Sequence, residues 1–365
     1  MNFERAVIKV GSALVAPDNK GCSGKYTLAI AQFITKCHQQ GREVILVSSG
    51  GVAAGRSLVQ HGTPKLSVAT KKAMASVGQM KMMANWQRLF DVPCSQILIT
   101  QSDLSDRERN ISIKETINIH LKNGIIPIVN ENDALVTADL TIGDNDNLAA
   151  LVAQVCDADT LYILSDIDGV FTKDPNIHSD AVLLPSIETI SDEIYAMAGT
   201  SRNPAATGGM KTKIQAAEKA VEFGINTYIL NGTNSEVFTS LLAKTNPGTH
   251  FTANTDGLTS KKHWLKHTLK SKGSITLDDG AVRALTEYGA SLLPSGIISI
   301  NIAFKAGDAI DLISSSNNTR FAKGVSLYNS QDLAKIKGKH SDDIPNILGK
   351  GLSEVVIRRD DLVLL

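Results

Sequence analysis

The sequence holds few cysteines, and no two of them lie close together. The four cysteines among its 365 residues are Cys22, Cys37, Cys94 and Cys156, without a Cys-x-x-Cys pair. This spacing argues against a zinc site of paired thiols and gives no disulfide framework. Scattered free thiols are typical of proteins in a reducing compartment.

Net charge and long apolar runs are also missing. Lys and Arg together number 37, and so do Asp and Glu, which makes the formal net charge zero. No global field therefore draws the protein toward nucleic acid or membrane. No apolar run has the length of a membrane span, and the sequence starts without a charged-then-apolar leader. We expect a cytoplasmic protein that makes no use of a membrane.

Short apolar runs alternate with amphipathic segments through the first two thirds of the sequence. The expected strands are 6–10, 44–47, 97–99, 125–129, 161–164 and 227–230, and the expected helices are 26–40, 68–90, 107–122, 147–156 and 210–223. Near-continuous apolar strands are typical of a parallel sheet covered on both faces. The alternation predicts an α/β fold, an αβα sandwich with a mainly parallel central sheet and right-handed crossovers.

The composition changes after residue 245. Residues 256–272 are rich in lysine and follow an Asn-Pro-Gly turn, which predicts a linker between a catalytic domain at 1–255 and a second domain at 273–365. The second domain holds short strand-like pieces at 274–277, 297–302, 309–313, 323–327 and 355–357. We expect it to be small and rich in β-structure.

In parallel α/β sheets the ligand lies beyond the carboxyl ends of the strands, and four polar clusters fall at such positions. The first is Lys9, inside the opening strand, followed by Gly11 and Ser12. A lysine in an apolar strand costs desolvation energy unless it meets an anion, and glycine lets backbone amides approach phosphate oxygens. The alternative is a lysine on an edge strand that reaches solvent.

The second cluster, SSGGVAAGR at 48–56, follows the strand at 44–47. Small residues that enter a helix leave N–H groups free to bind an anion. Arg56 stands where a Walker A motif has its lysine, so the anion could be a carboxylate as well as a phosphate. A plain tight turn between strand and helix is the alternative.

The third cluster consists of two runs, NEND at 130–133 and GDNDN at 143–147, with an expected hairpin at 134–142 between them. Helix capping explains one or two of these side chains. So many short carboxylates and amides favour the binding of an ammonium group and of Mg²⁺, since both prefer oxygen ligands.

The fourth cluster, TGGMKTK at 207–213, opens the helix expected at 210–223. Glycines ahead of a helix suit the phosphates of ATP, whereas the alternative is a flexible loop with solvated lysines. Together, the lysines, the carboxylates and the glycine-rich loops match phosphoryl transfer, which needs charge neutralisation and positioning more than covalent chemistry. No protein-kinase signature or Ser-His-Asp arrangement competes with this interpretation.

These motifs resemble the amino-acid-kinase family, and within it the members that phosphorylate glutamate. The matching strings, in family order, are IKVGSALV, VSSGGVAAGR, VGQ at 77–79, ILITQSDLSDRER, PIVNENDALVT, GDNDNLAALVA, SDIDGVFTKDP and TGGMKTKIQAA. From residue 273 to about 349, the strings GSITLDDGAVRAL, GASLLPSGI and AKGVSLYNSQDL resemble the PUA domain of RNA-modifying enzymes.

The resemblance implies ATP-dependent phosphorylation of the γ-carboxylate of L-glutamate to L-glutamyl 5-phosphate, the first step of proline biosynthesis, with Mg²⁺ as cofactor. It implies catalytic roles for Lys9, Lys213 and Asp146, of which Asp146 would also help to place the metal. It assigns substrate binding to Ser49, Gly50, Asn130, Asp133 and Asn145. The implied ATP-binding residues are Lys9, Gly11, Ser165, Asp166, Thr207, Gly208, Gly209, Met210, Lys211, Thr212 and Lys213.

The resemblance also implies partners. Members of the family are typically inhibited by proline and form homo-oligomers, dimers or tetramers, through the kinase domain. Functional coupling to glutamyl phosphate reductase is expected as well. Two alternatives stay open: a kinase for acetylglutamate or aspartate, and an RNA-binding protein that acts through its C-terminal module. The module has few aromatic side chains, which argues against stacking on single strands.

Overall fold

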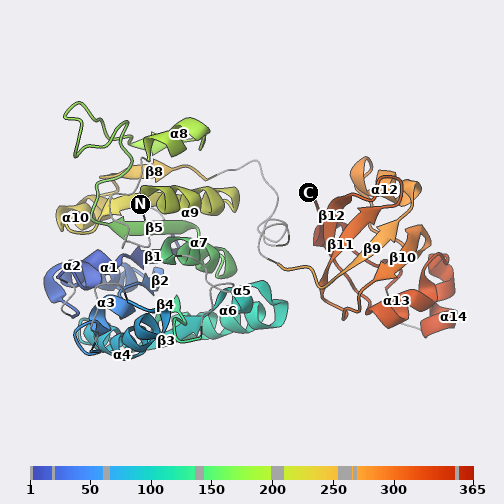
Figure 1. Ribbon diagram of the computed structural model, residues 1–365, viewed down its shortest axis with the longest axis horizontal. Coiled ribbons are helices and arrows are strands. Elements are labelled where there is room, and N and C mark those ends of the chain that lie inside the picture. Colours follow the sequence, from blue (N-terminus) through green and yellow to red (C-terminus); the bar gives the residue numbers. More distant parts are fainter. Residues whose placement is uncertain are drawn as a thin grey trace. The chain divides into compact units, whose positions relative to one another are not determined.

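The computed structural model describes residues 3–18, 21–60, 66–135, 144–198, 209–253, 265, 269–349 and 353–365. The chain forms two compact units, one of Met1–Asp103 with Ile111–Gly257 and one of Leu104–Asn110 with Leu258–Leu365. Figure 1 shows the elements of each unit. Most of the expected hairpin at 134–142 and of the expected linker at 256–272 lies outside the described residues. Within the described part of the chain, no helix has both the length and the apolar character to cross a membrane.

The first unit is built on an eight-stranded sheet in the order β3-β4-β2-β1-β5-β7-β8-β6. Its strands are β1 (Arg5–Val10), β2 (Glu43–Ser48), β3 (Cys94–Ile99), β4 (Ile126–Glu131), β5 (Thr160–Ser165), β6 (Ser186–Ile187), β7 (Asn226–Asn231) and β8 (Thr249–Phe251). The paired strands are parallel except β7 and β8, which run antiparallel. The expected mainly parallel sheet is confirmed, and the two short strands near one edge were not foreseen.

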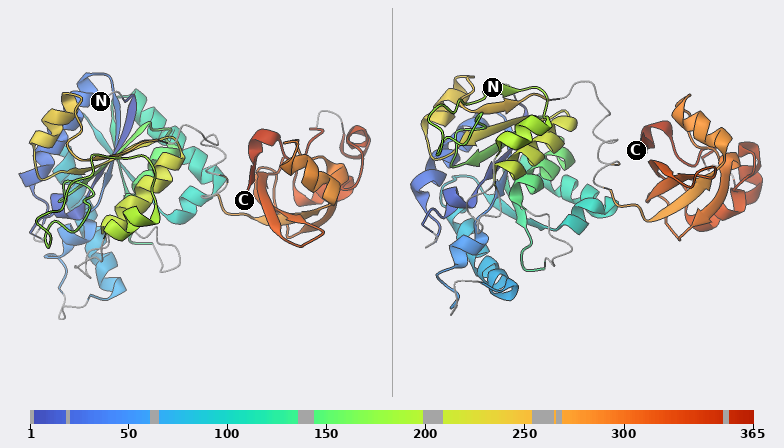
Figure 2. Two further views of the ribbon diagram at one scale, coloured as in Figure 1. Left: turned by 90° about the horizontal axis from the view of Figure 1, so that it is seen from above. Right: turned by 45° about the horizontal axis from the view of Figure 1, so that its top comes forward.

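Helices cover both faces of this sheet, as Figure 2 shows. They are α1 (Ser12–Val15), α2 (Gly24–Gln39), α3 (Gly51–Gly55), α4 (Val68–Gln87), α5 (Gln101–Ser105), α6 (Arg107–Lys122), α7 (Asn145–Val155), α8 (Asp192–Met197), α9 (Met210–Glu222) and α10 (Glu236–Leu242). Side chains of α2, α4 and α10 share one apolar core with the sheet, while α7 and α9 pack on the opposite face. These layers make the expected αβα sandwich.

Strand β1 lies inside the sheet, between β2 and β5. Ala6, Ile8 and Val10 belong to the apolar core under α2. Because side chains alternate along a strand, Lys9 points to the other face, toward α7. The alternative of an edge-strand lysine in contact with solvent is therefore wrong.

The second unit contains a five-stranded sheet in the order β10-β9-β11-β12-β13. Its strands are β9 (Gly273–Leu277), β10 (Ile297–Asn301), β11 (Ala309–Ser314), β12 (Arg320–Val325) and β13 (Leu362–Leu364), with helices α12 (Asp279–Thr286), α13 (Ser330–Ile336) and α14 (Ile344–Leu348). The strand expected at 355–357 is wrong, because only Ile357 forms a bridge there, to Leu292. A 3₁₀ turn at Arg359–Asp361 follows, and the edge strand β13 begins after it.

Candidate active site

Four strands of the first unit end at one edge of the sheet, and three of the four polar clusters of the sequence follow β1, β2 and β4, while the fourth leads into α9. The ends of β1, β2, β4 and β5 lead into Gly11, Ser49, Asn132 and Asp166 respectively. Since these strands are neighbours and run parallel, their carboxyl ends lie side by side. This is the edge at which open α/β sheets bind their ligands.

A buried cluster of three charges lies at this edge. Both Lys9 and Lys213 form ion pairs with the carboxylate of Asp146, Lys9 through Oδ1 and Lys213 through Oδ2, the latter at 3.1 Å. The Thr212 hydroxyl donates a further hydrogen bond of 3.0 Å to Oδ2. Lys9 is 6% exposed, Lys213 4% and Asp146 0%. Residues far apart in the chain thus converge on one carboxylate.

The electrostatics of the cluster favour an ionised Asp146. Burial by itself opposes the charge, but the two ammonium groups outweigh it and lower the pKa of Asp146 to about 2. Burial lowers the pKa of Lys9, an effect that Asp146 opposes and Lys213 reinforces. With both lysines protonated, the cluster holds two positive charges and one negative charge. A buried excess of positive charge is stabilised when an anion binds beside it.

The N-cap of helix α7 places Asp146 in the first turn of the helix. The Asp144 side chain accepts a hydrogen bond of 2.9 Å from the backbone N–H of Asn147, which makes Asp144 the N-cap. The sequence predicted that this helix starts at 147. The Asp144 cap starts it earlier, so that Asn145 and Asp146 occupy its first turn.

A second group of side chains joins the ends of β2 and β4 to the start of α7. The Asn145 Nδ2 donates to Ser49 Oγ and to Asn130 Oδ1, each at 2.8 Å, and to the backbone oxygen of Ser48 at 3.4 Å. Gly50 adopts a φ of 109°, which a side chain would strain, and it leads into α3. Four of the five predicted substrate-binding residues therefore lie together.

Asp133, the fifth of them, lies in the turn after β4 and is partly buried. Burial raises the pKa of Asp133 above its ordinary value, and no cation pairs with it among the described residues. A carboxylate in this condition is stabilised by an incoming ammonium group.

The predicted nucleotide-binding residues follow β1, β5 and the start of α9. The Gly11 N–H donates to Leu164 O at 3.2 Å, and the Ser165 hydroxyl donates to Asp166 at 3.1 Å. Gly209 is the N-cap of α9 and supplies no side chain to its first N–H groups. These groups can bind an anion, and Met210, Lys211, Thr212 and Lys213 make up the first turn. Thr207 and Gly208 lie outside the described residues.

Sequence reasoning gave no role to two residues that the structure links to this site. Gln79 of α4 accepts a hydrogen bond of 2.9 Å from Asn130 Nδ2, and the Trp86 indole donates one of 2.9 Å to Ser48 Oγ. Gln79 stands on the buried face of its helix, beside Ala75 and Met82. A polar residue at such a position is the signal that could have revealed it.

A metal ion is implied by the family resemblance, and Asp146 is the carboxylate predicted to help place it. Within the described ranges, no group of three or more His, Cys, Asp and Glu side chains is assembled that could hold one. Mg²⁺ in phosphoryl-transfer enzymes takes one or two protein carboxylates together with substrate phosphates. Asp146 is a buried carboxylate that two lysines contact, so it fits that pattern.

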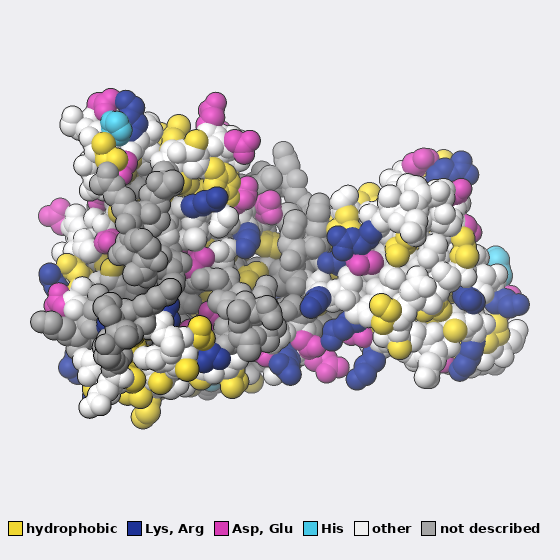
Figure 3. All heavy atoms as spheres, viewed as in Figure 1, with side chains coloured by type: hydrophobic (Ala, Val, Ile, Leu, Met, Phe, Trp, Pro, Cys, Tyr) yellow, Lys and Arg dark blue, Asp and Glu magenta, His cyan; other side chains and the backbone are white. Residues whose placement is uncertain are grey.

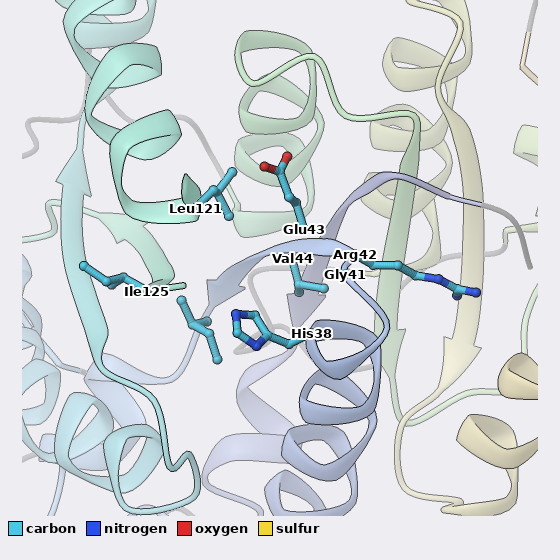
Figure 4. Close-up of a pocket in the computed structure, with 8 residues that line it drawn as sticks. His38, Gly41, Arg42, Glu43, Val44, Leu121 and Ile125 are labelled. Carbon is cyan, nitrogen blue, oxygen red and sulfur yellow. The ribbon is translucent and has the colours of Figure 1, made fainter. Parts of the chain in front are cut away.

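A hollow of ≈ 190 Å³ lies away from this edge, as Figure 4 shows. It is lined by His38 in the last turn of α2, by Glu43 at the start of β2 and by Leu121 of α6, among others. These positions are at the amino ends of the strands, opposite Ser49 and Asn130. We therefore place the active site at the carboxyl ends, where the buried charges converge.

Comparison with known proteins shows which families the two parts of the chain resemble. Residues 4–231 match the amino acid kinase family, and residues 273–348 match the PUA domain. All of the chain aligns with glutamate 5-kinase of Idiomarina loihiensis, at 50% identity over 98% of that protein. The glutamate 5-kinase of Salinibacter ruber is 48% identical over 99% of this chain and 97% of its own length.

Proposed function

The chain belongs to the amino acid kinase family, and from that premise we propose that it transfers the γ-phosphoryl group of ATP to the γ-carboxylate of L-glutamate. The product would be L-glutamyl 5-phosphate, the first intermediate of proline biosynthesis. The full-length similarity to glutamate 5-kinases supports this substrate. The single structural observation that carries the proposal is the buried cluster of Lys9, Asp146 and Lys213.

The cluster suits the charge of a transferring phosphoryl group. Lys9 and Lys213 would bind the phosphates, and Asp146 would hold the two ammonium groups in position. Electrostatic groups that are fixed before the reaction stabilise a transition state without reorganisation. The open N–H groups at the start of α9 would add to the binding of the phosphates.

The chemistry requires no general base. The side-chain carboxyl of glutamate has an ordinary pKa near 4.3, so it is ionised at neutral pH and already nucleophilic. A γ-carboxylate oxygen forms the new bond to the γ-phosphorus of ATP while the bond to the β,γ-bridging oxygen breaks. ADP leaves with that oxygen, and an acyl phosphate remains.

Glutamate would bind at the ends of β2 and β4. The carboxylates of glutamate would meet the hydroxyl and amide groups of Ser49, Asn130 and Asn145. Gly50 has no side chain, so the protein backbone could approach the substrate closely. Asp133 would pair with the α-ammonium group of glutamate. The pKa of Asp133 is raised by burial, so a bound cation would stabilise its carboxylate.

Mg²⁺ would bind with ATP, and Asp146 would help to place it. The ion supplies neutralisation of charge on the phosphate oxygens. Gly11, Ser165 and Asp166, beside the cluster, would contact the nucleotide together with the loop that includes Thr207 and Gly208.

We assign the kinase activity to residues 1–255 and a structural or regulatory role to the PUA-like residues 273–365. Figure 3 shows Lys and Arg on the visible face of the second unit interspersed with Asp and Glu. On that face positive charge is not gathered as RNA binding requires. RNA binding as the main function is therefore not part of the proposal.

Several finer properties belong to the same proposal. A cytoplasmic location, feedback inhibition by proline and coupling to glutamyl phosphate reductase follow from the proposed reaction and the family. A dimer or tetramer is supported by exposed apolar side chains on α4, where Val77 is 43% and Met80 76% exposed. Light scattering coupled to size exclusion would measure the assembly directly.

The proposal is tested by trapping the acyl phosphate. The protein is incubated with ATP, Mg²⁺ and hydroxylamine together with glutamate, N-acetylglutamate or aspartate, and the hydroxamate is measured. We expect hydroxamate from glutamate. Hydroxamate from either of the other acids in the absence of any from glutamate would refute the assignment.

A further inference from the structure

We infer that Gln79 is a positioning residue for the glutamate site, acting through Asn130. The inference rests on the proposed function, because it concerns how the proposed substrate-binding side chains are held. Gln79 lies on α4, is 7% exposed and belongs to none of the segments proposed to contact a ligand.

A chain of four amides runs from the active site to the edge of the sheet. Asn145 donates to Asn130, Asn130 donates to Gln79, and Gln79 Nε2 donates to Gln96 Oε1 at 3.1 Å. Gln96 is an exposed residue of the edge strand β3. Gln79 is the one member of this chain that joins the substrate-binding amides to the outer part of the fold.

The orientation of every amide in the chain is set from one end. The backbone oxygen of Ser48 can only accept a hydrogen bond, so the Asn145 group that faces it is its NH₂. That NH₂ also faces Asn130, which must therefore present its oxygen there and its own NH₂ to Gln79. Gln79 must then present its oxygen to Asn130. An amide at position 79 thus fixes which group Asn130 turns toward the substrate side.

Close packing of two helices holds Gln79 in place. A Cβ added at Gly78 would lie 1.8 Å from the backbone oxygen of Gly51, so only glycine allows α4 to approach α3 this closely. A Cβ added at Gly51 would lie 3.8 Å from Gln79 Oε1. Gly51 directly follows Ser49 and Gly50, so the packing places the Gln79 amide beside the glutamate-binding loop.

The role is tested by replacing the amide while keeping the size of the side chain. In Gln79→Met the buried Asn130 NH₂ loses its acceptor and is free to turn. We expect the KM for glutamate to rise about tenfold, the factor that corresponds to about 1.4 kcal/mol of binding free energy. We expect kcat to fall by less than about threefold and the KM for ATP to change by less than about twofold, since the phosphate-binding lysines are not in the chain of amides.

Two further variants make the test specific. Gln79→Asn keeps an amide but draws it back by about 1.5 Å, one carbon–carbon bond, and should also raise the KM for glutamate. This variant provides the test in case the Met variant does not fold. Gln87→Met is the matched control, because Gln87 lies on the same helix and makes two hydrogen bonds, to Val92 and Cys94, away from the site. Its KM values should equal those of the wild type.

The outcomes separate this inference from the proposed function. A glutamate KM within twofold of the wild type in a folded Gln79 variant would refute the positioning role, as would equal rises in the KM values for glutamate and ATP. In an Asn130→Ala background the Gln79→Met change should have no further effect, and an additive effect would show that Gln79 does not act through Asn130. Absence of hydroxamate from glutamate with the wild-type protein would instead refute the proposed function itself.

Discussion

Replacing Asp146 by asparagine removes the negative charge between two buried ammonium groups. Asparagine has nearly the same shape, so it fills the same space and keeps one oxygen as an acceptor. The change therefore tests the charge of Asp146 separately from its packing.

The magnitude follows from the pKa of Asp146. The lysines lower this pKa from an ordinary value of 3.8 to about 2, and one pKa unit corresponds to about 1.4 kcal/mol, so the ionised carboxylate gains about 2 kcal/mol in the folded state. Loss of one partner from a buried ion pair costs about 3–5 kcal/mol when the remaining charge cannot escape. Lys9 can escape by losing its proton, because its pKa is already lowered by burial. We therefore expect the smaller figure, about 2 kcal/mol of unfolding free energy.

The catalytic effect should be of the same size or larger. If the lost 2 kcal/mol had served to align the lysines in the transition state, kcat would fall about 30-fold. Without Asp146, the pKa of Lys9 should fall further, since only the smaller effect of Asp144 then opposes burial and Lys213. Protonated Lys9 is the active form in the proposed mechanism, so the kcat of the variant should decrease as pH rises, more steeply than the kcat of the wild type.

The assay combines hydroxamate formation with urea unfolding. A group whose pKa is lower in the folded state stabilises the protein above its unfolded-state pKa and loses this effect as pH falls toward the folded-state value. The difference in unfolding free energy between wild type and Asp146→Asn should hence be constant from pH 8 to about pH 5 and shrink below about pH 4.

A matched control lies at the amino ends of the strands, on the side of the sheet away from the proposed active site. Asp159 accepts hydrogen bonds from the backbone N–H groups of Glu4 and Arg5, at 2.7 and 3.1 Å. Asp159→Asn should lower stability by about 1 kcal/mol and leave kcat unchanged within about twofold. A wild-type kcat in folded Asp146→Asn, or an equal loss of kcat in Asp159→Asn, would refute the reasoning.

Three more predictions concern single side chains. Lys213→Met should lower kcat at least about 100-fold with little change in the glutamate KM, as measured by hydroxamate kinetics, and turnover near that of the wild type would remove Lys213 from catalysis. Asp133→Asn should raise the glutamate KM about tenfold. The wild-type KM should rise as the pH is lowered, because the raised pKa of Asp133 lets it gain a proton more readily than an ordinary carboxylate, and this rise should vanish in the variant. Glutamate should change the fluorescence of Trp86, because the indole donates a hydrogen bond to Ser48, next to the proposed substrate-binding Ser49. The measurement uses a Trp264→Phe background, and an unchanged spectrum at saturating glutamate would contradict this coupling.

The longer strands and helices of the first unit could be predicted from the sequence because their signals are local, whereas short elements such as α8 and β6 were missed. Buried strands such as β1 read as apolar runs, and α6 has the bounds that its pattern predicts, Arg107–Lys122. Element ends were less certain. The start of α7 depends on whether Asp144 or a later residue caps the helix, and several residues of the run at 143–147 are good caps.

The sequence by itself determined which residue types are present for the chemistry: a lysine in an apolar strand, glycines before helices and two runs of carboxylates and amides. Only the tertiary structure decided which of them meet. That Lys9 and Lys213 share the carboxylate of Asp146 follows from the order of the strands and from the face on which α7 and α9 pack. The place of Gln79 depends on the close approach of α4 to α3. There Gly78 packs against Gly51, which lies more than 20 residues earlier in the sequence. Periodicity reports only whether a side chain is buried, whereas a hydrogen-bond partner is set by packing between distant segments.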